Sequence, residues 1–484
     1  MGARRQRIGG ATLLALAFFG LYLLFARQAL HGYDAYAAVR AAQGSPVMES
    51  GHLFYIPLAK LAWALLSPFV PGAFEALRVL SALGVAIGVF FAHRCAVALR
   101  LERPAAAAIA FGLVPTAFYF ASTVEVDGLL LGAAGGAWLL WIRLARRQRA
   151  RDALAAGLAT ALVACLHGGG HLLFAAGCTL SGARAVQRMR CQRAWQPLRR
   201  HGVLLALAFG AHAAAFTAAS MVCGNSHQAV MAGNGLLLSL QPARLPATML
   251  FEWLLPYAPF SLLWLLGFVR PTTRWLTAAF AVVLVGYVVF TNAVMGWFEL
   301  QEPELRENGA FLVGICLPMV LQAHAALRPR LAWLATATAA VVAILLVRHD
   351  DWAPVPPGFT AGLRAVAVEP VELWSDGKRR EGGWVMKDAG RAELVIASTL
   401  PRLISSLEEA GTVVTAEAVA AWFDERFEKL RADGRSLLIL DGAMASLRES
   451  DPRMRALVDE HLPRHYVLEP VVAPPFPAVR LRRR

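Results

Sequence analysis

The sequence has little charge and no ordered cysteine pattern. Only 17% of its 484 residues are charged and 57% are hydrophobic, whereas an ordinary soluble domain carries about 25% charged residues. Its six cysteines are scattered and include no Cys-x-x-Cys pair, so neither a disulfide framework nor a cysteine metal site is predicted. Its apolar runs are continuous rather than alternating, which excludes a membrane β-barrel. A soluble enzyme and a disordered chain are excluded as well.

The net charge is +14, which in a soluble protein would suggest a nucleic-acid partner. Here much of the arginine excess lies in short segments between apolar runs, where it indicates the cytoplasmic side of a membrane. We therefore expect no nucleic-acid partner. The arginine-rich segments are 94–103, 143–151, 184–200, 270–274 and 328–330.

Apolar runs recur from residue 11 to residue 347 and predict an α-helical polytopic protein of about eleven membrane spans. If the arginine-rich segments all face the cytoplasm, the opposite loops are acidic or nearly neutral, as the positive-inside rule requires. Arg4, Arg5 and Arg7 before the first run place the N-terminus in the cytoplasm, and the odd number of spans then places the C-terminus outside. The runs are 11–25, 74–98, 104–122, 128–145, 153–167, 169–183, 202–222, 248–269, 275–295, 309–327 and 331–347.

One apolar segment is not counted as a span. Residues 53–70 carry Lys60 in the middle, and counting them would move the arginine-rich segments outside. We therefore expect an amphipathic helix on the outer surface. The two short runs within 153–183 are consistent either with a tight hairpin or with one long broken helix, and the sequence does not choose between them.

The composition changes after residue 347. A proline-rich linker precedes the predicted strands 393–398 and 436–442, and amphipathic helical stretches alternate with them up to a closing pair of strands. This alternation predicts a small soluble α/β domain. The predicted domains are thus a membrane domain, 1–347, and an outer domain, 348–484.

Ionisable residues from separate loops gather on the predicted outer side. Asp34 follows the first span and is either the N-cap of a surface helix or a general base. Glu125 and Asp127 either favour the N-terminus of the next span or belong to a site. His167 and His171 are either turn residues or donors to a ligand.

Five short motifs then suggest a family. They are YDAY (33–36), GHLFYIPLAKLAWAL (51–65), ASTVEVDGLLL (121–131), ACLHGGGHLLF (164–174) and LRENGAFLVGICLPM (305–319). In this order they resemble motifs of the GT-C glycosyltransferases, among them bacterial relatives of protein O-mannosyltransferases and aminoarabinose transferases. Two positions depart from the pattern. Ala35 replaces a second acidic residue after Asp34, and Asp127 replaces the tyrosine of an ExY-like motif.

The resemblance implies a GT-C-like catalytic domain in a bacterial inner membrane. It would transfer a sugar from a polyprenyl-phosphate donor to a glycan, lipid or protein acceptor at the periplasmic face. Asp34 would be the general base, and Glu125 the second catalytic candidate. The expected substrate-binding residues are Tyr33, His52, Tyr55, Asp127, His167, His171, Arg306 and Glu307.

No clustered DxD-type ligand set is present, which favours action without a metal and leaves a divalent metal as an open question. Two other classes fit the hydropathy. A transporter or flippase usually shows inverted repeats, and none is evident. A non-catalytic envelope assembly protein would leave the long charged first loop unexplained.

Overall fold

The structure is a computed structural model. It describes residues 2–26, 32–44, 53–167, 169–223, 257–269, 310–351, 370–375, 392–396, 413–473 and 476–484, with isolated positions 254, 277, 281, 284, 404 and 408. The chain divides into two compact units, one of residues 1–26 and 37–349 and one of residues 27–36 and 350–484.

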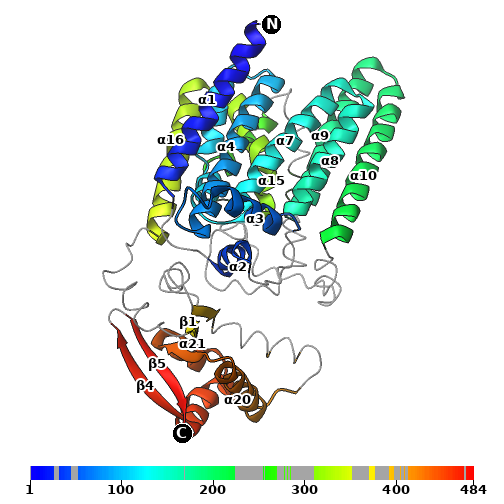
Figure 1. Cartoon of the computed structure of the whole chain (residues 1–484). Coiled ribbons are helices and arrows are strands. Elements are labelled where there is room, and N and C mark those ends of the chain that lie inside the picture. The colour runs from blue at the N-terminus through cyan, green and yellow to red at the C-terminus, as the bar shows by residue number, and fades with distance from the viewer. Residues whose placement is uncertain are drawn as a thin grey trace. The chain divides into compact units, whose positions relative to one another are not determined.

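The first unit is a bundle of helices (Figure 1). Its described helices are α1 (Gly2–Leu24), α3 (Tyr55–Leu66), α4 (Ala73–Leu99), α5 (Pro104–Gly112), α6 (Pro115–Ser122), α7 (Val126–Arg147), α8 (Ala150–Leu166), α9 (Gly169–Gln192), α10 (Gln196–Cys223), α13 (Phe260–Leu263), η3 (Trp264–Phe268), α15 (Ala310–Ala326) and α16 (Pro329–Asp351). Helix α2 (Gly32–Ala42) has residues in both units.

Three described helices are long and apolar enough to cross a membrane: Ala73–Leu99, Val126–Arg147 and Gln196–Val222. Large apolar side chains are also exposed on the shorter apolar helix α16, where Leu334 and Leu345 are more than 60% exposed. Such surfaces suit lipid rather than water. The run 275–295 and most of 248–269 lie outside the described residues, so the number of about eleven spans stays a prediction.

The run 104–122, expected as one span, is two helices bent by 59°. Pro115 is the first residue of α6, and Val114 before it takes an extended ψ of 136°. Proline disfavours helical backbone at the preceding residue, which explains the break. The Gly112 carbonyl accepts a 2.8 Å hydrogen bond from the Tyr22 hydroxyl of α1, so a buried oxygen at the break is satisfied.

The segment 153–183 is a helical hairpin. Arg188, near the end of α9, donates to the carbonyls of Ala145 (3.2 Å) and Arg146 (2.7 Å), at the end of α7. Because α8 begins three residues after α7 ends, the start of α8 and the end of α9 lie at the same end of the bundle. The two helices are therefore antiparallel.

Helices α4 and α7 run parallel in close contact. A Cβ atom added at Gly84 would lie 2.5 Å from the Gly128 carbonyl oxygen, and one added at Gly132 would lie 2.5 Å from that of Gly84. Farther along, the Cys95 Sγ lies 3.7 Å from the Gly135 oxygen. Only residues without a side chain permit this approach of the two backbones.

The second unit contains a five-stranded mixed sheet in the order β2-β1-β3-β5-β4. Strand β1 pairs in parallel with β2 and β3, while β5 pairs antiparallel with β3 and β4. The strands are β1 (Val371–Ser375), β2 (Ala392–Ile396), β3 (Ser436–Leu440), β4 (Tyr466–Ala473) and β5 (Phe476–Arg483). The helices are α20 (Ala416–Ala432), α21 (Asp441–Ser450), α22 (Pro452–Ala456), η4 (Leu457–His461) and α23 (Leu462–His465).

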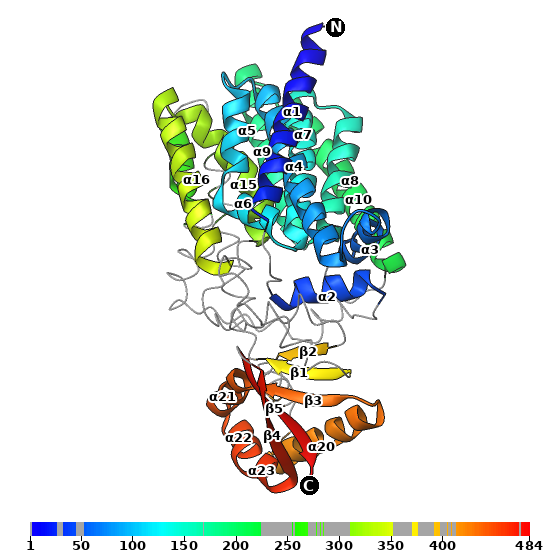
Figure 2. The ribbon, with the colours of Figure 1, turned by 60° about the vertical axis from the view of Figure 1, so that its left-hand side comes forward.

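Helix α20 lies beside the sheet (Figure 2), and aromatic side chains join the two. The Phe423 ring meets those of Trp374 and Tyr466, each at a centroid distance of 5.6 Å. Beneath it, Glu372 of β1 is completely buried and is paired with Arg426 of α20. The Trp374 indole N–H donates to the same carboxylate at 2.9 Å, so the buried charge is both paired and hydrogen-bonded.

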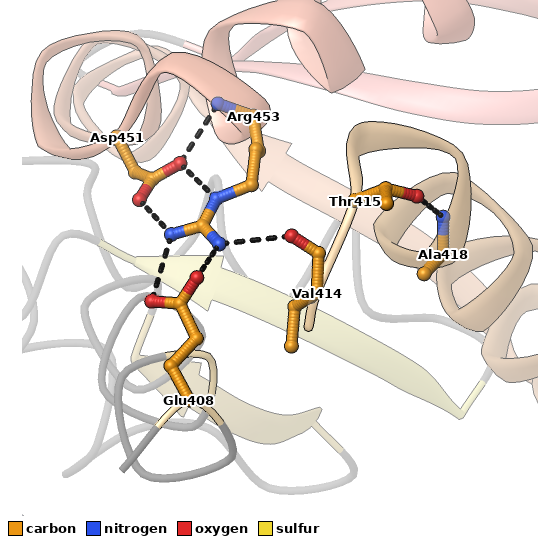
Figure 3. A network of polar contacts seen from close by, with 6 residues as sticks. All are labelled: Glu408, Val414, Thr415, Ala418, Asp451 and Arg453. Atoms are coloured by element: carbon orange, nitrogen blue, oxygen red, sulfur yellow. Dashed lines mark hydrogen bonds and ion pairs between the residues drawn. The ribbon is translucent and has the colours of Figure 1, made fainter. Parts of the chain in front are cut away.

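A second ion-pair network fixes the start of α22 (Figure 3). Arg453 donates to Asp451 through its backbone N–H (2.7 Å) and its side chain, and it also pairs with Glu408 and the Val414 carbonyl. The Arg453 hydrogen bonds hold the pKa of Asp451 below its usual value. Beside it, Thr415 caps α20 by accepting from the Ala418 N–H at 3.2 Å. We interpret this network as structural.

Candidate active site at one end of the helical bundle

The helical bundle has two chemically different ends. At one, which we call the arginine-rich end, guanidinium groups bind free carbonyls at helix termini: Arg200 donates to Gln148 at 3.1 Å, and Arg188 donates to Arg146. The opposite end, which we call the site end, contains the starts of α4 and α7, the α8–α9 turn and α3. Both views show α3 at the end of the bundle away from the N-terminus (Figures 1 and 2).

Glu125 and Asp127 lie at the site end, where α7 begins. Glu125 is the N-cap residue, and its side chain makes no capping hydrogen bond. Its backbone is held instead by Ser81 of α4, whose hydroxyl donates to the Glu125 carbonyl at 3.2 Å and accepts from its N–H at 3.4 Å. Asp127 lies in the first turn of α7 and is 5% exposed. A carboxylate there favours the helix N-terminus, so helix stabilisation and a role in a site are compatible for Asp127.

The first loop meets the α8–α9 turn at the same end. The Phe54 N–H donates to the Cys165 carbonyl at 3.1 Å. This bond holds the start of α3, which includes the buried Tyr55, against the end of α8. Cys165 is two residues before His167 in the chain. His167 ends α8 in extended backbone, and its carbonyl accepts from the Gly170 N–H at 2.9 Å. Of the predicted substrate-binding residues, Tyr55 and His167 thus lie in segments joined by a backbone hydrogen bond.

His171 pairs with a histidine that the sequence analysis did not select. Its Nδ1 lies 3.0 Å from Nε2 of His212 on α10. His171 is exposed and His212 is buried, and the Phe174 and Phe216 rings complete the cluster, each with a centroid 4.8 Å from a histidine ring. One imidazole donates and the other accepts, so the pair also links α9 to α10.

Several predicted residues cannot be placed in this arrangement. His52, Arg306 and Glu307 lie outside the described residues. Tyr33 and Asp34 lie in the first turn of α2, and the structure describes their backbone only. Because α2 begins at Gly32, Asp34 lies in the first turn of the helix. An acidic residue there still favours the helix N-terminus, so helix stabilisation and catalysis both remain open for Asp34.

Sequence reasoning missed Arg78, Ser81 and His212. Ser81 and His212 give no sequence signal, because single polar residues in apolar helices are common and their partners are distant in the chain. Arg78 did give a sequence signal, because a charged residue inside the apolar run 74–98 is costly in a membrane. As for metals, no group of three His, Cys, Asp or Glu side chains suited to an ion occurs within the part of the chain that the structure describes.

The fold is similar to that of two solved structures of membrane glycosyltransferases, and the similarity extends over nearly the whole chain. The crystal structure of ArnT from Cupriavidus metallidurans in the apo state matches with a TM-score of 0.55 at 13% sequence identity, covering 99% of this chain and 98% of that chain. ArnT from the same organism bound to undecaprenyl phosphate matches with a TM-score of 0.53 at 15% identity, covering 98% and 97%.

A third structure, the Archaeoglobus fulgidus oligosaccharyltransferase in complex with Zn and sulfate, matches less well. Its TM-score is 0.49 at 12% identity, with 95% of this chain and 71% of that chain covered. No protein-family model and no curated protein sequence matches the chain. The likeness is therefore one of fold, and it confirms the predicted GT-C resemblance at that level.

Proposed function

We propose that the chain is an integral-membrane glycosyltransferase that moves a sugar from a polyprenyl-phosphate donor to an acceptor. The observation that carries the proposal is the full-length likeness to ArnT, one structure of which is bound to undecaprenyl phosphate. The helical bundle and the soluble tail are both included in that likeness. The acceptor is a glycan, a lipid or a protein, and the reaction takes place at the periplasmic face of a bacterial inner membrane.

In this proposal Asp34 is the general base. Its carboxylate removes the proton from the acceptor hydroxyl or amine while the acceptor atom attacks the anomeric carbon of the sugar. The bond from that carbon to the phosphate oxygen breaks, the oxygen keeps the electron pair, and the configuration inverts. Glu125 is the second candidate for the base.

The leaving group is a lipid phosphate, so hydrogen-bond donors near its oxygens lower the barrier. His167, His171 and Arg306 are the proposed donors, and Tyr33, His52, Tyr55, Asp127 and Glu307 complete the proposed substrate site. The proposal requires no metal ion, so EDTA should leave turnover unchanged. In this topology α3 lies on the outer surface. With 12 residues it is about 18 Å long, too short to cross a bilayer.

The proposal is tested with the purified full-length protein and a panel of radiolabelled undecaprenyl-phosphate sugars, using membrane extract as the acceptor. Asp34→Asn keeps the size of the side chain and removes its basicity, so turnover should fall about a hundredfold or more. Thermal stability and binding of undecaprenyl phosphate should not change.

Glu125→Gln in the same assay tests the second candidate. Glu102→Gln is the matched control, because Glu102 is exposed at the arginine-rich end. Near-normal turnover in Asp34→Asn would remove Asp34 from the mechanism and make Glu125 the base. No transfer by the wild type from any donor would contradict the function itself.

A further inference from the structure

Arg78 is a charged residue on the buried face of a membrane-spanning helix. It lies in the second turn of α4, within the apolar run 74–98. Residues three, four and seven positions away within the helix share its face. Glu75 among them is half-buried, as is Arg78 itself. The other four are at most 5% exposed: Phe74, Ser81, Ala82 and Val85. Arg78 therefore faces the inside of the bundle rather than lipid.

The Arg78 side chain lacks an anionic partner among the described residues. Its Nε is buried and makes no hydrogen bond there. Its guanidinium carbon lies 5.4 Å from the centre of the Phe74 ring. Glu75 on the same helix is the nearby opposite charge, and no ion pair joins the two side chains in the described structure. An arginine within a membrane span is costly and normally faces a counter-charge, so this site suits a ligand that carries one.

Arg78 lies at the site end of the bundle. Ser81, which holds the backbone of Glu125, is three residues further along α4. Three residues of helix rise by about 4.5 Å, so Arg78 lies about one turn beyond the level of Glu125, toward the end of the bundle. Arg94, on the same helix, is about 24 Å from Arg78 along the axis and lies toward the arginine-rich end.

We infer that Arg78 binds the phosphate group of the polyprenyl-phosphate donor and holds the phosphate that leaves. This inference rests on the proposed function. A guanidinium binds phosphate through parallel N–H groups in its plane, and the Phe74 ring beside it adds a cation–π attraction that helps to fix its position. When the sugar–phosphate bond breaks, the phosphate oxygen gains negative charge, which a fixed cation stabilises.

The test measures the affinity of purified full-length protein in detergent for undecaprenyl phosphate and for undecaprenol, which lacks the phosphate. Loss of a charge-assisted hydrogen bond costs about tenfold to a hundredfold in affinity. Arg78→Gln should lower the affinity for undecaprenyl phosphate by that factor and leave the affinity for undecaprenol unchanged. Arg78→Lys keeps the positive charge and should retain part of the affinity. Arg94→Gln, the matched control on the same helix, should bind like the wild type.

The outcomes separate this inference from the function on which it rests. If the wild type prefers undecaprenyl phosphate and Arg78→Gln keeps that preference, the role of Arg78 is overturned and the proposed function stands. If the wild type binds the two lipids equally, the proposed donor is overturned and the inference falls with it. Should Arg78→Gln not fold, Arg78→Lys decides: reduced affinity for undecaprenyl phosphate alone supports the inference, and wild-type affinity for both lipids, or equal loss of both, overturns it.

Discussion

Asp424, in the C-terminal unit, is the centre of a polar cluster that joins three elements. Its Oδ1 accepts from the Tyr466 hydroxyl of β4 at 2.6 Å and lies 2.8 Å from Nε2 of His461 in η4. The His461 ring stacks on that of His465 at a centroid distance of 4.5 Å. Partial burial raises the pKa of Asp424, but the hydrogen bonds from Tyr466 and His461 outweigh it and hold the pKa below its usual value.

Asp424→Asn should therefore destabilise the tail at neutral pH and have less effect in acid. A lowered pKa in the folded state adds stability above the unfolded pKa of about 3.9, and this stability is lost as the pH falls through the folded pKa. The carboxylate is 36% exposed, so we expect about 1 kcal/mol after solvent screening. Hydrogen exchange of α20 and η4 in the full-length protein should be about fivefold faster than in the wild type at pH 7.

The difference in hydrogen exchange between Asp424→Asn and the wild type should become smaller as the pH falls from 5 to 3. Asp433→Asn is the control, because Asp433 is the exposed C-cap of the same helix. A difference that stays constant over this pH range would show that the charge of Asp424 does not contribute.

Single residues also show how much of a site the sequence can reveal. Glu125 and Asp127 were selected because carboxylates at a membrane boundary are costly, and the structure places both at the start of α7. His212 and Ser81 gave no such signal, because each matters through a partner on another helix. A pairing between residues 41 positions apart, such as His171 with His212, depends on tertiary packing that no local pattern specifies.

The close contact between α4 and α7 leaves little room for a larger side chain. Gly132→Ala would place a Cβ atom 2.5 Å from the Gly84 carbonyl oxygen, so the two backbones would have to separate. We expect a loss of about 1–3 kcal/mol, seen as a lower thermal midpoint in detergent. Gly210→Ala on α10 is the control, because a Cβ there meets nothing within 4 Å. Equal stability of Gly132→Ala and the wild type would mean that α4 and α7 are not packed so closely.

Helix boundaries show why hydropathy alone is not enough. The run 104–122 looks like one span, since Pro115 interrupts its backbone without interrupting its hydrophobicity. The two short runs within 153–183 could not be assigned, because apolar content does not distinguish a hairpin from a broken helix. In the structure, the hydrogen bonds from Arg188 of α9 to the carbonyls at the end of α7 show that the segment is a hairpin. The helix break and the hairpin are therefore visible in backbone geometry and tertiary hydrogen bonds, and hydrophobic periodicity does not reveal them.

At the scale of the whole molecule, charge distribution and fold are consistent. Arg188 and Arg200, from a segment that the positive-inside rule assigns to one side of the membrane, bind helix termini at one end of the bundle. Among the described residues, Glu125 and His167 lie at the other end. The order of the motifs predicted the GT-C fold from residues alone, because loops between spans keep their sequence order and side. The spatial placement of Asp34 within a site needs side-chain positions that the sequence does not provide.

We predict from α16 the side of the membrane on which the tail lies. The apolar part of this helix, Pro329–Leu345, is shorter than the three described helices that are long enough to cross a membrane. The whole helix of 23 residues is nevertheless about 35 Å long, and we expect it to cross the hydrocarbon layer of about 30 Å. It begins after Arg328, which the positive-inside rule places in the cytoplasm, so its other end and the tail should lie outside. Alkaline phosphatase fused after Arg484 should be active, because its disulfides form only in an oxidising compartment, and a fusion after Gln148 should be inactive. An inactive phosphatase together with a fluorescent cytoplasmic reporter at Arg484 would reverse the topology and move the site end to the cytoplasmic face.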